Sequence, residues 1–173
     1  MNTECQHLFD AYIYRSAQCE GYLEITEQQY PGELASPRQV HELAEEYRKA
    51  AILLLPSCRR GKPLTRAPFR LSALQAIELY LTALLLHHGQ SPKEIRSLQH
   101  DLAARMERAL DAGLRLRAKT AKHLQNLSHN REYLVTRYGP ELATTSSQLN
   151  RLTATLEEVA GKVATLIARD AIR

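Results

Sequence analysis

The sequence predicts an all-α protein, an up-and-down bundle of four to five helices with an N-terminal helix and a long C-terminal heptad helix. Residues 71–86 are apolar around most of a helix circumference, as expected of a helix that neighbours bury on several sides. Apolar residues in the flanking segments recur at steps of three and four between helix-start and helix-stop signals. No window alternates apolar and polar residues with β-branched side chains, so no strand is expected.

The composition is that of an ordinary globular protein. The 173 residues are 44% apolar and 24% charged, which is enough for one hydrophobic core. The longest uncharged apolar run, 79–89, is about half as long as a membrane span, and the first residues lack a signal-peptide pattern. Three cysteines at no metal-ligand spacing suit a reducing compartment, and the net charge of +4 permits an anionic partner. We therefore expect a cytoplasmic protein without membrane contact, metal centre or cofactor.

The chain is expected to form one helical domain. Its parts are an extension over residues 1–35, a bundle over 36–140 and a C-terminal helix over 145–173, used for packing or dimerisation. Within the extension, a helix is predicted over about 7–19 from its apolar spacing. No internal repeat or low-complexity linker divides these parts.

A long basic connection separates the first core helix from the central one. The first helix starts at a capping box in which Ser36 and Gln39 flank Pro37, and it ends at Pro56. The connection over 56–68 contains three prolines, one glycine and four bases whose charge suits phosphate groups: Arg59, Arg60, Lys62 and Arg66. A solvated, mobile loop without a ligand is the alternative.

Two more helices are predicted after the central helix. Gly89 ends the central helix, a capping box over 91–94 starts the next one, and Gly113 ends that helix. Its inward stripe consists of Leu98, Leu102, Met106, Ala109 and Leu110. The fourth helix is predicted to run as one piece from about Thr120 to the turn before Pro140.

One arginine lies on the expected inner face of the fourth helix. A buried arginine is strongly destabilising unless a carboxylate and further acceptors meet it. Glu78, on the narrow polar stripe of the central helix, is the expected partner of Arg131, and Asp101 is the second candidate. The sequence thus predicts a buried polar cluster of Glu78, His100 and Arg131, either as a structural ion pair or as a ligand site.

The last helix carries a heptad seam. A capping box over 145–148 is expected to start it. Apolar residues then repeat at alternating steps of three and four, namely Leu149, Leu152, Leu156, Val159, Val163 and Leu166. The seam either packs along the bundle or pairs with a second subunit.

Short motifs, taken in order along the chain, resemble those of the HEPN domains of bacteria and archaea. They are Gln75-Ala76-Ile77-Glu78 leading into Ala83-Leu84-Leu85-Leu86, then Gly89, then His100-Asp101-Leu102, and finally Arg137-Tyr138 before Pro140. The resemblance covers about residues 36–140. It implies a four-to-five-helix bundle, commonly a homodimer, in a family tied to nucleotide binding and to RNA cleavage in toxin, antiphage and RNA-processing systems.

The chain departs from the ribonuclease members that it resembles. Those members carry an arginine followed after four to six residues by a histidine on the last core helix, which forms a metal-free acid/base site across a dimer. No histidine follows Arg131 at that distance, and Thr82 stands where the family frequently has a lysine. Arg117 with five residues to His123 is one formal match, but about two such matches arise by chance in this composition.

The resemblance, together with the lack of a well-placed arginine–histidine pair, implies a non-catalytic HEPN-like binding or assembly module that engages a nucleotide, RNA or a partner protein in a stress, toxin–antitoxin or RNA-related system. The expected binding residues are Glu78, His100, Asp101, Arg131 and Arg137 together with the basic loop. One alternative is a metal-independent endoribonuclease that uses Arg117 and His123 or a site around Arg131. The other is a structural oligomerisation subunit. Glycine-rich phosphate loops and nucleophile elbows do not occur in the sequence, which favours the non-catalytic option without excluding an enzyme.

Overall fold

The computed structural model describes residues 30–170, and this part of the chain is all helical. It contains seven α-helices, α2 to α8, and within the described range there is no strand. The all-α prediction is therefore confirmed. The helix predicted over 7–19 lies outside the described residues.

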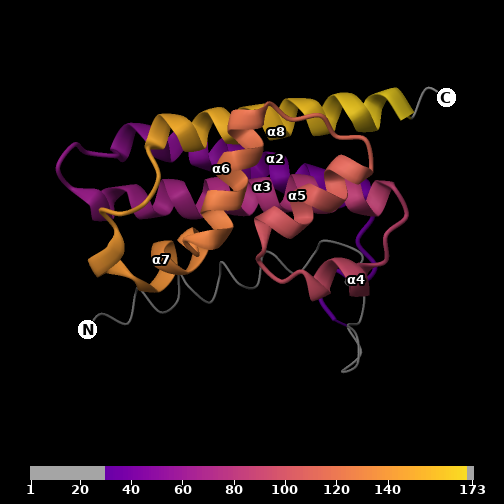
Figure 1. The fold of residues 1–173 in the computed structure, drawn as a ribbon, viewed down its shortest axis with the longest axis horizontal. Helices are drawn as coiled ribbons and strands as arrows, with labels where there is room; N and C mark the ends of the chain where they lie inside the picture. The colour runs from indigo at the N-terminus through magenta and orange to yellow at the C-terminus, as the bar shows by residue number, and fades with distance from the viewer. Residues whose placement is uncertain (1–29, 171–173) are drawn as a thin grey trace, which may run out of the picture. The chain divides into compact units, whose positions relative to one another are not determined.

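Two long helices, α2 (Pro37–Leu54) and α3 (Ala67–His87), lie side by side (Figure 1). The capping box at the start of α2 is confirmed, because the Ser36 hydroxyl accepts from the Gln39 amide and the Gln39 side chain accepts from the Ser36 amide. The segment Pro63–His87 is long and apolar enough to cross a membrane, but 61% of its most apolar window is buried inside the bundle. In this structure it is the core helix.

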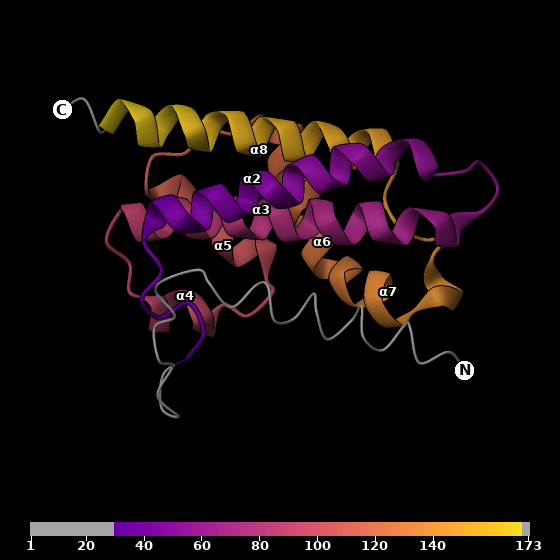
Figure 2. The same cartoon turned by 180° about the vertical axis from the view of Figure 1, so that it is seen from behind.

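A third long helix, α8 (Leu149–Asp170), packs along α3 and runs beside α2 in both views (Figure 1, Figure 2). The heptad seam of α8 is buried within the chain at Leu152, Leu156, Val159, Val163 and Leu166, with Leu149 half-buried. The seam therefore packs in cis, and a homodimer would have to use another surface. The capping box predicted over 145–148 is wrong, because α8 begins at Leu149 and the Thr145 hydroxyl donates instead to the Leu142 carbonyl.

The single helix predicted after Gly89 is two helices, α4 (Pro92–Ser97) and α5 (Leu102–Asp111). The capping box at the start of α4 is confirmed. Gln99, with a left-handed φ of 48°, interrupts the helical path, and the Asp101 carboxylate then caps α5 by accepting two backbone amides. The continuous helix was therefore wrong, but its inward stripe is confirmed: Leu102, Met106 and Ala109 are buried, and Leu98 and Leu110 are half-buried against the core.

The predicted fourth helix is also two helices, α6 (Ala118–His129) and α7 (Glu132–Tyr138). Asn130 ends α6, and Arg131 adopts a left-handed φ of 48° before α7 begins. A left-handed residue turns the chain, so helical periodicity does not continue across it. Arg131 is consequently exposed and Glu132 is buried, which shows that the predicted inner face was wrong by one residue.

Candidate functional site

A polar hollow of about 370 Å³ lies where the two helix breaks meet. Its walls come from the turn between α4 and α5, the last turns of α6 and the start of α7, all drawn below α3 in Figure 1. The lining residues are Leu98, Gln99, His100, Asp101, Ala103, Gln125, Ser128, His129, Arg131 and Tyr133. The two interruptions that the sequence periodicity did not predict thus build one site.

The two breaks share an unusual backbone conformation. Gln99 and Arg131, each with a φ of 48°, are the only non-glycine residues with a positive φ between residues 30 and 170. The left-handed region costs an L-residue roughly 1–2 kcal/mol. Such strain persists where the surrounding structure imposes it, and it clusters at binding and catalytic sites. Because both residues line the polar hollow, we regard it as the candidate functional site.

A polar network supports the α4–α5 side of the hollow. Glu78 on α3 contacts the Nδ1 atom of His100 at 3.1 Å and the guanidinium of Arg105 at 3.4 Å. Arg105 also donates to the Thr82 hydroxyl at 2.9 Å and to the carbonyl of Gln99. Burial lowers the pKa of Arg105, which is 5% exposed, and the charge of Glu78 opposes this shift. The network ties the strained turn to α3 and orients His100.

Part of the predicted polar cluster is present and part of it was wrong. The contact between Glu78 and His100 is confirmed, but Arg105 rather than Arg131 supplies the buried arginine. Asp101 is an exposed helix cap. Arg105 follows Leu102 by three residues and precedes Ala109 by four, so it lies on the inward stripe of α5. This spacing could have identified Arg105 as the buried arginine from the sequence.

Flat rings and basic groups face the hollow. The rings of His100 and Tyr133 lie 4.9 Å apart and are tilted by 40°. His129 and Arg131, both exposed, add donors from the α6–α7 side. Because Nδ1 of His100 is hydrogen-bonded to Glu78, Nε2 is the ring nitrogen that remains for a ligand. Ring faces beside an arginine suit a planar base and its phosphate.

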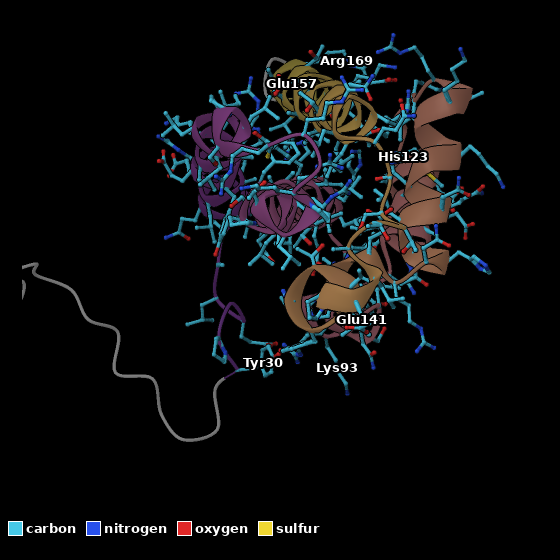
Figure 3. The ribbon with its side chains drawn as sticks, turned by 90° about the vertical axis from the view of Figure 1, so that its left-hand side faces the viewer. Tyr30, Lys93, His123, Glu141, Glu157 and Arg169 are labelled. Carbon is cyan, nitrogen blue, oxygen red and sulfur yellow. The ribbon has the colours of Figure 1, made fainter. Side chains whose placement is uncertain are left out.

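The formal arginine–histidine match does not form one site. Arg117 is exposed and its Nε atom donates to Glu158 at 2.7 Å. His123 is buried between α6 and α8, with Nδ1 2.8 Å from the Thr155 hydroxyl (Figure 3). Burial, reinforced by nearby arginines, lowers the pKa of His123 to about 4. An enclosed, neutral imidazole is badly placed to exchange protons with an RNA strand.

Glu158 explains why Arg117 is held at the surface of α6. Its carboxylate, on α8, accepts from the Arg117 backbone amide at 2.8 Å and from the Thr120 hydroxyl at 2.6 Å. It therefore caps the N-terminus of α6 from a neighbouring helix. Burial alone would raise the pKa of Glu158, but hydrogen bonds from Lys162, Thr120 and Arg117 lower it to about 2.

A second buried ion pair joins α3, α7 and the segment that precedes α8. Arg70 and Glu132 meet at 2.9 Å, with side chains 5% and 2% exposed. Glu132 also accepts from the Ser147 amide at 2.7 Å, and Arg70 donates to the Ser147 carbonyl. Sequence reasoning missed this pair. Asn130 could have indicated it, because asparagine often ends helices. A helix end at Asn130 would allow Glu132, and not Arg131, to face the core.

The other predicted binding residues lie outside the hollow. The basic connection contains the 3₁₀ turns Leu55–Ser57 and Pro63–Arg66. On this connection Arg59, Arg60 and Lys62 are exposed, and Arg66 is half-buried. Arg137 is exposed on α7 and lines a different cavity. Of the predicted set, the hollow brings together His100, Asp101 and Arg131, with Glu78 behind them.

Replacing Gln99 with glycine should stabilise the fold by about 0.5 kcal/mol. Glycine adopts the left-handed conformation without steric cost, and this gain exceeds the extra entropy that glycine adds to the unfolded chain. Urea unfolding measures the change. The matched control is Gln125→Gly inside α6, where glycine should destabilise by about 1 kcal/mol. Equal losses in the two variants would show that residue 99 is unstrained.

The all-α fold is shown by the structure, whereas the HEPN resemblance stays a prediction from short motifs. No protein-family model, curated protein or solved structure matches this chain.

Proposed function

We propose that this chain is a non-catalytic, HEPN-like binding module whose polar hollow binds a nucleoside phosphate, either free or as a unit of single-stranded RNA. The observation that carries the proposal is the convergence of Gln99 and Arg131, the two strained residues, on one hollow. A volume of about 370 Å³ is of the size that small-ligand sites have. The net charge of +4 favours an anionic ligand over a cationic one.

Each wall has a distinct role in this proposal. Arg131 and His129, on the α6–α7 side, donate to the phosphate. Tyr133 and His100, whose rings pack against each other in the wall, supply the aromatic surface that contacts the base. Asp101 contributes little to recognition, because its Oδ1 atom caps α5 by accepting two amides and the N-terminus of that helix offsets its charge.

Calorimetric titration with adenosine 5′-monophosphate, adenosine and a short single-stranded RNA tests the proposal. Adenosine should bind at least tenfold more weakly than the monophosphate, because a hydrogen bond to a charged group contributes about 1.5–3 kcal/mol. If the RNA binds more tightly than the monophosphate, the ligand is a unit of a strand. Similar affinities indicate a free nucleotide.

Variants at exposed arginines locate the binding. Arg131→Asn should weaken binding of the monophosphate about tenfold, and asparagine tolerates the left-handed backbone at this position. Arg115→Asn removes the same charge from an exposed residue outside the hollow and should leave affinity unchanged. Equal affinities for both variants and the parent, or no binding at millimolar concentration, would contradict the proposal.

One observation favours the ribonuclease alternative. Glu78 and His100 form a carboxylate–imidazole pair at the edge of the hollow, near His129 and Arg131. Such a pair can hold the imidazole in one tautomer for proton transfer. RNA cleavage that persists with a chelator and disappears in His100→Ala would establish this alternative and overturn the non-catalytic proposal.

A further inference from the structure

A second cavity, of about 230 Å³, lies between the first turns of α3, α7 and the segment that leads into α8. Its walls are mostly apolar and include Pro63, Leu64, Ala67, Val135, Pro140 and Ala143. None of its lining residues also lines the polar hollow. We call it the α7 cavity, and it needs an explanation beyond the function proposed above.

Two buried polar atoms of residues that line the α7 cavity are unpaired. Neither Arg70 Nε nor Thr136 Oγ1 has a hydrogen-bond partner among residues 30–170. The other two guanidinium nitrogens of Arg70 are engaged by Glu132 and by the Ser147 carbonyl. An unpaired buried polar group costs about 1–3 kcal/mol. Both atoms belong to residues of the cavity wall, and both lack an acceptor.

The charge around the α7 cavity favours an anion. Arg137 lines the cavity, and Arg66 lies close enough for its charge to contribute to the lowered pKa of Arg70, whose main cause is burial. The carboxylate of Glu132 balances Arg70 and is already occupied by it and by Ser147. The carboxylate of Glu141 lies beside Gly139 in the wall, so the two positive charges of Arg66 and Arg137 exceed the remaining local negative charge by one.

We propose that the α7 cavity binds a small monocarboxylic acid with an apolar body. The carboxylate accepts from Arg70 Nε and from the Thr136 hydroxyl, as charge-assisted hydrogen bonds. The apolar body contacts the proline, leucine, alanine and valine side chains of the wall. A volume below the range of roughly 300–1,000 Å³ for larger ligands limits the body to one ring or a short branched chain.

Titration of the full chain with sodium benzoate tests this assignment, with neutral benzamide as a probe of the same shape. Calorimetry gives the affinity, and the side-chain Nε–H resonance of Arg70 reports whether the ligand reaches that atom. Benzoate should bind saturably and shift this resonance. Benzamide should bind about tenfold more weakly, because it lacks the charge.

Three variants separate the α7 cavity from the rest of the surface. Thr136→Val removes the unpaired hydroxyl, leaves the Arg70–Glu132 pair in place and should weaken benzoate binding about fivefold. Ala143→Leu fills the cavity and should abolish binding. Thr144→Leu places the same side chain at the next residue, which is exposed and outside the cavity, and should change nothing.

Three results would overturn the assignment. One is equal binding of benzoate and benzamide. Another is unchanged benzoate affinity in Ala143→Leu. The third is no binding of benzoate or of the smaller isobutyrate at millimolar concentration, which would mean that only water fills the cavity.

Discussion

Glu132→Leu should lower the free energy of unfolding by about 3–5 kcal/mol, because it leaves the buried guanidinium of Arg70 without its carboxylate. A loss of this size is a large fraction of the stability of an ordinary domain. Urea unfolding followed by circular dichroism measures it. The double variant Arg70→Met with Glu132→Leu should recover much of the loss, because no unpaired charge is left inside.

The matched control for Glu132→Leu is Arg131→Asn, at the preceding residue. Arg131 is exposed, so this change should alter stability by less than about 0.5 kcal/mol. A large loss at 131 with a small loss at 132 would instead support the inner face that uninterrupted helical periodicity predicts.

His123 should make the fold sensitive to acid between pH 6.5 and about 4. Its pKa in the folded protein is lowered to about 4, so the unfolded chain binds more protons in this interval. The stability contributed by a neutral His123 is complete above pH 6.5 and is lost as the pH falls toward 4, with a total loss of about 3 kcal/mol. Unfolding free energies measured across this interval give the slope.

His123→Leu should flatten that slope, because the imidazole that must stay neutral in the core is gone. His129→Leu removes an exposed histidine from the same helix and should leave the slope as it is in the parent. If the two variants change the slope equally, His123 is not the group that titrates.

The sequence predicted the features that depend on neighbouring residues. The capping boxes at Ser36 and Ser91 are local hydrogen-bond patterns, and both helices begin where these patterns indicate. The apolar circumference of α3 likewise identified the core helix. Among the predicted contacts of the site, the one between Glu78 and His100 is present.

The sequence did not predict the features that depend on a single left-handed residue or on distant pairing. Gln99 and Arg131 change the direction of the chain without a glycine or proline to signal it. The predicted inner face of α7 was therefore wrong by one residue. Arg70 and Glu132 are separated by 62 residues, so no local periodicity relates them. The hollow depends on both breaks, which is why His100, Asp101 and Arg131 were the only binding residues of its wall that the sequence predicted.

The most direct test of the proposed nucleoside-phosphate site is to locate the ligand on the chain. Backbone amide resonances, recorded by nuclear magnetic resonance during titration with adenosine 5′-monophosphate, give the location residue by residue. The binding-module proposal predicts saturable shifts over residues 98–103 and 125–133, and none over the basic connection at 59–66. Shifts confined to 59–66, or no shift anywhere at millimolar nucleotide, would contradict it.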